Sequence, residues 1–266
     1  MATIYRYSNN DICEVTPVFY GDVAFSTFRA FGTVIPWWDH HLERLKRGAY
    51  FLARDHNWDS LLINLQDGQR QFAKYFQGRE WMGRPTIRRV EANLQLDFYA
   101  WEAQVLSHTP QKLALALEER TRTLPTDVKG GNYKIETLGR EWAITQGMDD
   151  VLFWHGPQKF VSETSTSNIF FLNAQRELHT PAIVEGSCLG GIVREQVVTM
   201  AKKLGLQIFE RPIALMELEK MTEAFLTNCG QLIRPVERIG NYFFSSSNSL
   251  TNELVKELKL HITNLK

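Results

Sequence analysis

Two residues of this chain have the types and settings that could do chemistry, a lysine and a glutamate. Lys129 is followed directly by Gly130 and Gly131, where an extended segment should give way to a helix. Glycines let the backbone approach a ligand closely, and a lysine desolvated in such a place has a lowered pKa and becomes nucleophilic. Glu163 lies in a turn rich in serine and threonine, just before the apolar segment 168–172. The pair predicts an amine that forms a Schiff base and a carboxylate that holds a proton on a heterocyclic nitrogen.

A phosphate site follows further along the chain. Gly190 and Gly191 open an expected helix that continues with Ile192 and Val193, and the N-terminus of a helix binds phosphate through its backbone N–H groups. Arg44 could reach a phosphate with two hydrogen bonds. A protein that binds pyridoxal phosphate needs a lysine for the Schiff base, a carboxylate for the ring nitrogen and donors for the phosphate. Each feature alone also fits a plain role: a surface lysine, a turn-forming glutamate, an unliganded helix start and a surface ion pair.

The elements expected to position these residues alternate between helices and strands. Apolar residues spaced three and four apart predict the helices, and runs rich in β-formers predict the strands. The first expected helix is capped by Asp39, with Leu42, Leu45, Ala49 and Leu52 inward, and the second covers 59–76. The third runs from about 132 to Gly147, with Ile135, Leu138 and Trp142 on one face. The fourth covers 191–205, with Val197, Met200, Ala201 and Leu204 inward, and the fifth carries Leu250, Leu254 and Leu258. The expected strands are 24–31, two within 85–101 joined by a turn at 91–93, 113–117, 151–154, 168–172, 207–213 and 224–227.

Composition limits the class of protein. The 266 residues carry no formal net charge, so no electrostatic argument favours nucleic acid or an anionic membrane as a partner. Three cysteines far apart match neither a disulfide framework nor a zinc site, and no metal is expected. The N-terminus has no apolar signal core, and no apolar run approaches the ~20 residues that span a bilayer. We therefore expect a cytoplasmic protein that binds a small molecule.

The motifs, taken in order, resemble those of the fold-type IV pyridoxal phosphate enzymes, which include branched-chain aminotransferases, D-amino acid aminotransferases and aminodeoxychorismate lyase. The resemblance covers nearly the whole chain, and the combination of motifs is specific. The matching pieces are Tyr20-Gly21-Asp22 with Phe25 and Arg29, His41-Leu42-Glu43-Arg44-Leu45, Lys129-Gly130-Gly131-Asn132, Glu163 with Asn168-Ile169-Phe170, Thr180-Pro181, Gly191-Ile192-Val193-Arg194, Leu204-Gly205 with Glu210-Arg211, and Glu223 with Pro235-Val236.

This resemblance implies a fold and a set of roles. It implies an α+β fold of two α/β domains, with the cofactor in the cleft between them, in a homodimer. The expected division is an N-terminal domain over 1–107, a linker over 108–112 and a cofactor-binding domain over 113–266. The roles implied by position are Lys129 for the Schiff base, Glu163 for the pyridine nitrogen, Arg44, Ile192 and Val193 for the phosphate, and Cys229 where aminotransferases of this family often carry a phosphate-binding threonine.

Three departures from the aminotransferase pattern resemble aminodeoxychorismate lyase. Thr27 stands where branched-chain enzymes have glycine, Val193 stands where aminotransferases have threonine, and Asn228 precedes Cys229. The resemblance therefore implies a 4-amino-4-deoxychorismate lyase that releases pyruvate and para-aminobenzoate for folate synthesis. By position, Thr27 would orient the substrate or the lysine, and Asn228 would contact the substrate.

Substrate recognition stays open at this stage. The glycine- and arginine-rich loop that many members carry is missing, so the substrate carboxylate would be bound by Arg88, Arg89 or Arg234. Tyr133, which follows the lysine motif, is a further candidate for substrate binding. Two alternatives to the lyase remain: an aminotransferase acting on D- or branched-chain amino acids, and a cofactor-binding protein without turnover.

Overall fold

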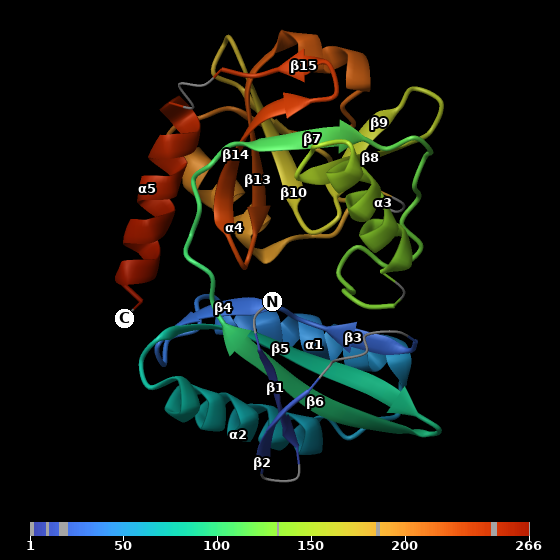
Figure 1. The fold of residues 1–266 in the computed structure, drawn as a ribbon, viewed down its shortest axis with the longest axis vertical. Coiled ribbons are helices and arrows are strands. Elements are labelled where there is room, and N and C mark those ends of the chain that lie inside the picture. The colour runs from blue at the N-terminus through green and yellow to red at the C-terminus, as the bar shows by residue number, and fades with distance from the viewer. Residues whose placement is uncertain are drawn as a thin grey trace. The chain divides into compact units, whose positions relative to one another are not determined.

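The chain forms two compact units in a computed structural model (Figure 1). The structure describes residues 3–8, 11–15, 21–131, 133–184, 187–245 and 249–265. The first unit comprises Met1–Val105, Asp127–Tyr133 and Leu265–Lys266, and the second comprises Leu106–Thr126 and Lys134–Asn264. The domain division expected at 108–112 remains a prediction, because compactness does not establish which segments fold independently.

An antiparallel sheet forms the centre of the first unit. Its strands follow the order β2-β1-β6-β5-β3, and β4 also pairs with β5. The long hairpin of β5 and β6 turns at residues 91 and 92, where Glu91 has a φ of 54°. The strands are β1 (Ile4–Ser8), β2 (Asp11–Glu14), β3 (Val23–Phe25), β4 (Phe28–Phe31), β5 (Glu80–Val90) and β6 (Asn93–Glu102).

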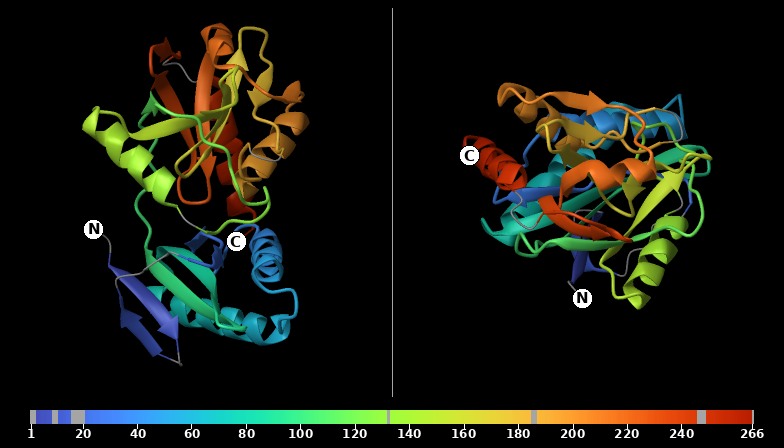
Figure 2. Two further views of the ribbon diagram at one scale, coloured as in Figure 1. Left: turned by 90° about the vertical axis from the view of Figure 1, so that its right-hand side faces the viewer. Right: turned by 90° about the horizontal axis from the view of Figure 1, so that it is seen from above.

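Two helices pack on this sheet, α1 (Trp38–Leu52) against β3 and β5 and α2 (Trp58–Phe76) against β6 and β1 (Figure 2). The core formed by the sheet and these helices is largely aromatic. It includes Phe28, Phe72, Trp81 and Phe98, which are all essentially inaccessible to water. Such residues bury the largest apolar area per side chain, so they supply much of the driving force for folding this unit.

The strand expected over 24–31 and the helix cap expected at Asp39 both need correction. The single strand expected over 24–31 is two strands, β3 and β4, and the break between them falls at Ser26 and Thr27. Asp39 does not cap α1; the cap position is Trp37, in the left-handed conformation with φ of 56°, and Asp39 lies in the first helical turn. A carboxylate there still interacts favourably with the helix dipole.

A larger mixed sheet forms the second unit, with the strand order β12-β11-β10-β13-β14-β7-β8-β9 and β15 paired with β14. The pairs β7–β8, β7–β14 and β11–β12 are parallel, and the other pairs are antiparallel. The strands are β7 (Gln111–Leu115), β8 (Asp150–His155), β9 (Phe160–Thr164), β10 (Asn168–Asn173), β11 (Leu178–Thr180), β12 (Ile208–Glu210), β13 (Met221–Asn228), β14 (Leu232–Ile239) and β15 (Tyr242–Phe243).

Three α-helices and a 3₁₀-helix accompany this sheet: α3 (Lys134–Thr145), α4 (Ile192–Lys203), α5 (Ser249–Thr263) and η1 (Leu215–Lys220). Helices α4 and α5 contact each other and β13, whereas α3 lies on β8, where Ala143 packs with Val151 and Phe153. The helices α1 to α5 are those expected from the sequence. Their inward faces were partly wrong, because Ile135, Leu138 and Leu204 are exposed.

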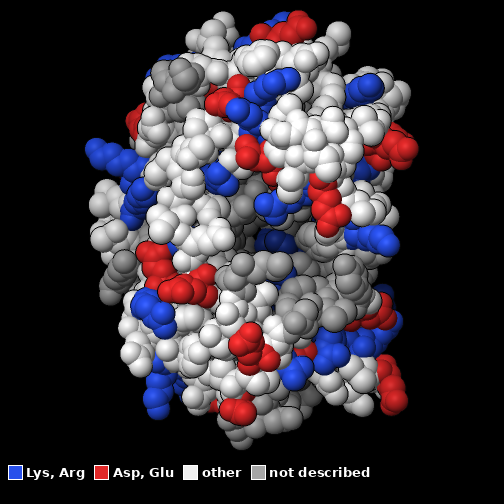
Figure 3. All heavy atoms as spheres, viewed as in Figure 1, with Lys and Arg blue, Asp and Glu red and all other residues white. Residues whose placement is uncertain are grey.

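Charged side chains of both signs are interspersed over the face seen in Figure 3, in keeping with the zero net charge. Within the described part of the chain, no helix combines the length and apolarity needed to cross a bilayer.

Candidate active site

The segment that carries Lys129 runs beside β3 as an additional extended piece of the first unit. The Lys129 carbonyl accepts a hydrogen bond of 2.7 Å from the Phe25 amide, and the Gly131 amide donates to the Val23 carbonyl at 2.9 Å. A Cβ on Gly130 would lie only 2.0 Å from that Val23 carbonyl oxygen. Glycine is therefore required at residue 130 for this close approach, which is to the backbone of β3, whereas the sequence predicts an approach to a ligand. Asn132 of the same motif lies outside the described residues.

The side chain of Lys129 lies on an aromatic ring that a second cation shares. Its Nζ is 5.5 Å from the ring centroid of Phe25, and the guanidinium of Arg84 is 4.9 Å from the same ring. Thr27, in the break between β3 and β4, accepts a 2.9 Å hydrogen bond from Arg84 Nε. Tyr133 packs its ring against Phe25 at 5.5 Å. The structure thus brings three predicted site residues, Lys129, Thr27 and Tyr133, together around Phe25.

Arg84 was missing from the sequence-based candidates. It lies on β5 opposite Tyr99, and its guanidinium also stacks on Trp101 at 5.5 Å. Burial lowers the pKa of Arg84, although a guanidinium remains charged at any ordinary pH. Because side chains alternate along a strand, Arg84 and Arg88 point to the same face, and the sequence alone could not choose between them.

Arg88, the predicted substrate ligand, has a different setting. Its Nε donates to Asp97 Oδ2 at 2.6 Å. Both residues line a polar cavity of about 550 Å³ in the first unit, and its described lining includes neither Lys129 nor Thr27. A role for Arg88 in substrate binding stays a prediction. Arg84, rather than Arg88, shares the Phe25 ring with Lys129.

Helix α1 carries a buried histidine one turn before Arg44. His41 Nδ1 lies 2.7 Å from the hydroxyl oxygen of Ser26, and both side chains are fully buried. Burial lowers the pKa of His41 well below its usual value, and the nearby charges of Arg44, Lys129 and His40 lower it further. The histidine is therefore neutral in the folded chain, so it adds no charge beside Arg44, the predicted phosphate ligand.

The stability of the protein is expected to fall as the pH drops below about 6.5, because unfolded His41 takes up a proton that folded His41 does not. The unfolded state then binds more protons, so the free energy of unfolding decreases by up to about 1.4 kcal/mol per pH unit for this group. Urea unfolding between pH 5 and 8 measures the effect. His41→Asn should flatten this part of the curve; a curve equal to that of the unmodified protein would contradict the assignment.

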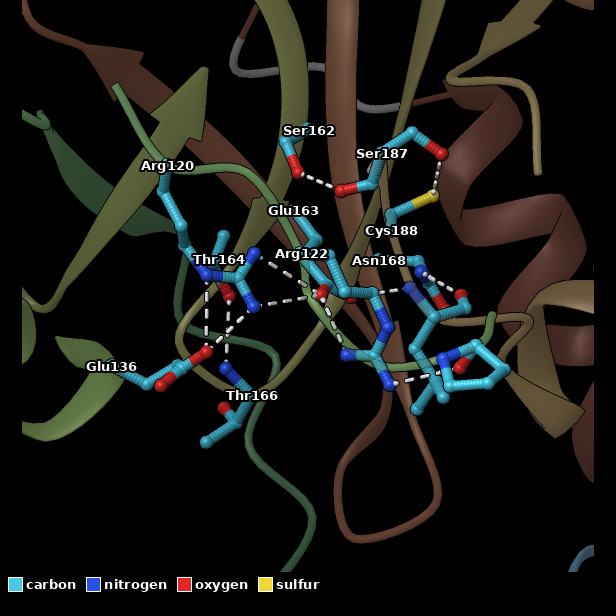
Figure 4. Close-up of polar contacts among 12 residues, drawn as sticks. Arg120, Arg122, Glu136, Ser162, Glu163, Thr164, Thr166, Asn168, Ser187 and Cys188 are labelled. Carbon is cyan, nitrogen blue, oxygen red and sulfur yellow. Dashed lines mark hydrogen bonds and ion pairs between the residues drawn. The ribbon is translucent and has the colours of Figure 1, made fainter. Parts of the chain in front are cut away.

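Glu163 lies at the centre of a buried charge cluster in the second unit (Figure 4). Its Oε1 accepts hydrogen bonds of 3.3 Å from Arg120 Nη1 and Nη2 and forms an ion pair of 3.7 Å with Arg122. Its Oε2 accepts one hydrogen bond of 3.1 Å from the Leu189 amide. A carboxylate has about four acceptor positions, so Oε2 can accept one more donor, such as a protonated ring nitrogen.

The surroundings of Glu163 differ from the expected turn. Glu163 belongs to strand β9, and the turn follows it. The Thr164 hydroxyl accepts hydrogen bonds from the amides of Thr166 and Ser167, so these residues hold the turn. The hydroxyl of Ser165 is buried and makes no hydrogen bond to the part of the chain that the structure describes.

The N-terminus of α4 has the form of an anion site. Gly191 caps the helix in an extended conformation and provides no side-chain hydrogen bond, so the first-turn amides of Ile192 and Val193 have no partner within the helix. A Cβ on Gly191 would lie 2.0 Å from Asn168 Oδ1, and Asn168 Nδ2 is fixed by the Leu189 carbonyl at 2.7 Å. Residue 191 must therefore be glycine for the helix to begin here.

Gly191→Ala is expected to weaken cofactor binding at least tenfold, because the new methyl group displaces either Asn168 or the first turn of α4. The dissociation constant of pyridoxal phosphate measures it. Thr199→Ala, at an exposed position on the same helix, is the control and should bind as the unmodified chain does. Unchanged affinity for Gly191→Ala would exclude the start of α4 as the phosphate site.

Asn228 is the last residue of β13, and Cys229 begins the loop that follows. Asn228 Oδ1 accepts hydrogen bonds from the amides of Gly230 and Gln231, and its Nδ2 donates to Ser167 at 2.8 Å. The side chain thus shapes the loop, and its predicted contact with substrate stays a prediction, as does the phosphate role of Cys229. The hydroxyl of Thr227, in β13, is buried and has no hydrogen-bond partner among the described residues.

These residues fit pyridoxal phosphate. The second unit offers an acceptor on Glu163, a helix start without a side-chain cap, and the buried hydroxyls of Ser165 and Thr227, which have no partner among the residues that the structure describes. The first unit offers an amine on Lys129 and two arginines, Arg44 and Arg84. Each group has the donor or acceptor character that an aldehyde, a pyridinium or a phosphate requires.

Comparison with known proteins gives the family. A model described as amino-transferase class IV matches residues 23–239. Branched-chain-amino-acid aminotransferase 2 of Bacillus subtilis is 33% identical over 144 residues, which cover 51% of this chain but only 39% of that protein. The chain thus spans less than half the length of this relative.

Two solved structures share the fold. An aminotransferase from Brucella abortus bound to pyridoxal phosphate superposes with a TM-score of 0.79 at 17% identity, covering 96% of this chain and 99% of that one. A protein from Legionella pneumophila, described as a "putative 4-amino-4-deoxychorismate lyase", gives 0.79 at 22% identity, covering 92% and 96%. The expected fold of the fold-type IV enzymes is confirmed. This chain belongs to the amino-transferase class IV family.

Proposed function

We propose that the chain is a 4-amino-4-deoxychorismate lyase that releases pyruvate and para-aminobenzoate. The observation that carries the proposal is the cluster of Thr27, Arg84 and Lys129 around Phe25. The two cations lie on one aromatic ring, so an amine that reacts at Lys129 can present a carboxylate to Arg84. The substrate has both groups, an amine and carboxylates, on a small rigid ring.

Each of these residues would have one role in the reaction. Pyridoxal phosphate supplies an electron sink for the bond that breaks at the substrate carbon bearing nitrogen. Lys129 would hold the cofactor and, once the substrate amine has replaced it, take the proton from that carbon. Glu163 would keep the ring nitrogen protonated. Arg84, held by Thr27, would bind a substrate carboxylate and orient the ring.

Phosphate binding would come from three places. Arg44 and the amides of Ile192 and Val193 provide cationic and dipolar donors, and Cys229 stands in the loop where the family often has threonine. In this scheme two copies of the chain associate as a homodimer, in keeping with the resemblance to the fold-type IV enzymes.

A direct assay tests the proposal. With 4-amino-4-deoxychorismate as the only substrate, pyruvate is followed with a coupled dehydrogenase and para-aminobenzoate by its fluorescence. Equal release of both products without an added keto acid supports the lyase. No release, together with amino transfer from D-alanine or leucine to 2-oxoglutarate, would overturn it.

The second candidate is an aminotransferase for branched-chain or D-amino acids. It is favoured by the similarity to the Bacillus subtilis branched-chain enzyme. Both candidates need Lys129, Glu163 and Arg44, so these residues do not separate the two activities and an assay is required. Stable conversion of the cofactor to its amine form by an amino acid would support this candidate instead.

A further inference from the structure

Arg120 bridges two buried carboxylates in the second unit (Figure 4). Its Nε and Nη2 donate to Glu136 Oε1 at 3.0 and 2.6 Å, and its Nη1 and Nη2 donate to Glu163 Oε1 at 3.3 Å each. The side chains of Arg120, Glu136 and Glu163 are 7%, 13% and 9% exposed. The shorter bonds go to Glu136, so Glu136 anchors the guanidinium that faces Glu163.

The guanidinium is held from other directions as well. It stacks on the ring of Phe153 at 5.0 Å, and the Arg120 amide donates to the Trp154 carbonyl at 2.8 Å. Burial opposes the charge of Arg120, but the carboxylates of Glu163 and Glu136 outweigh burial and raise its pKa. The arginine is therefore rigid and fully charged, which makes it a fixed electrostatic element beside Glu163.

The charges in this cluster balance only when Glu136 is counted. Two arginines, Arg120 and Arg122, contact the single carboxylate of Glu163, which leaves an excess of one positive charge. Glu136, in the first turn of α3, removes that excess. Charges interact strongly in a buried setting of low effective dielectric, so the balance changes the potential on any cationic group bound at Glu163.

The contacts also orient Glu163. Its Oε1 is occupied by the arginines, whereas Oε2 has one donor, the Leu189 amide, and capacity for another. Arg120 therefore selects which oxygen remains for the ring nitrogen of the cofactor.

We propose that Glu136 and Arg120 are a positioning pair for Glu163: Arg120 orients the carboxylate toward the cofactor's ring nitrogen, and Glu136 cancels the charge that Arg120 would otherwise impose there. The inference rests on the proposed role of Glu163 but not on the choice between lyase and aminotransferase. Neither Arg120 nor Glu136 touches the reacting atoms in this scheme.

The test is a pH titration of the absorbance of the holoenzyme, since the linkage between Lys129 and the cofactor changes colour when it loses its proton. Glu136→Gln leaves an uncancelled positive charge, which disfavours the protonated cofactor. We expect the titration midpoint to fall by about one pH unit. Glu163→Gln should shift it in the same direction. Glu141→Gln, at an exposed position on the same helix, should not shift it.

A double variant provides a second test of the charge balance and separates a change of charge from misfolding. Arg120→Met with Glu136→Gln removes both charges at once, so the midpoint should return toward that of the unmodified enzyme. A shift with Glu163→Gln but none with Glu136→Gln would overturn the positioning pair alone. No shift with Glu163→Gln would overturn the role of Glu163 and the pair with it. A double variant that shifts as far as Glu136→Gln would also contradict the charge balance.

Discussion

Replacing Lys129 by alanine is expected to abolish covalent attachment of pyridoxal phosphate and to lower kcat by about a thousandfold or more. The extended segment that carries Lys129 is fixed by backbone hydrogen bonds to Val23 and Phe25, so its amine is held in one place. Alanine can supply neither the attachment nor the proton transfer. The measurements are the absorbance of the purified holoenzyme, its mass after borohydride reduction, and its turnover.

Lys134→Ala is the matched control. Lys134 is exposed at the first position of α3, five residues further along the chain. Its loss should leave the cofactor attached and the turnover unchanged. If Lys129→Ala kept the absorbance of the linkage and its turnover, neither proposed activity could stand, because both depend on this amine.

Replacing Arg84 by methionine is expected to lower kcat/KM by roughly a hundredfold, since a buried charged partner of a substrate carboxylate contributes about 2–5 kcal/mol. Methionine keeps the apolar contact with Phe25 and Trp101, so the loss should come from the missing charge and from the missing donor to Thr27. Steady-state kinetics across substrate concentrations would measure it, and KM should rise more than kcat falls.

Arg88→Met provides the comparison, because Arg88 lies four residues away on the same strand and face but binds Asp97. It should change kcat/KM by less than about threefold at a temperature where the variant is folded, as expected for a partly exposed ion pair away from the substrate. The reverse pattern, a large loss for Arg88→Met and none for Arg84→Met, would restore Arg88 as the substrate ligand.

Local patterns in the sequence predicted much of the architecture. Apolar residues three and four apart predicted the segments of α1, α3, α4 and α5, because residues with this spacing lie along one side of a helix. The double glycine after Lys129 predicted a close approach of the backbone to a ligand. The structure shows a close approach to the Val23 carbonyl, which lies where a side chain on Gly130 would have to be. The weaker predictions were those on helix faces, since Ile135 and Leu138 have helical spacing but remain exposed.

The sequence by itself determined the family, because the order of its motifs along the chain is enough to recognise it. It supplied the cofactor, Lys129, Glu163 and the start of α4 as predictions. Tertiary structure decided how those residues are supported. The pairing of Arg84 with Thr27 spans 57 residues, and that of Arg120 with Glu163 spans 43. Strand register and the burial of charges set such contacts, and neither is visible in local spacing. The charge balance proposed around Glu163 depends on Glu136, a residue that looks like an ordinary helix-surface acid until the fold places it beside Arg120.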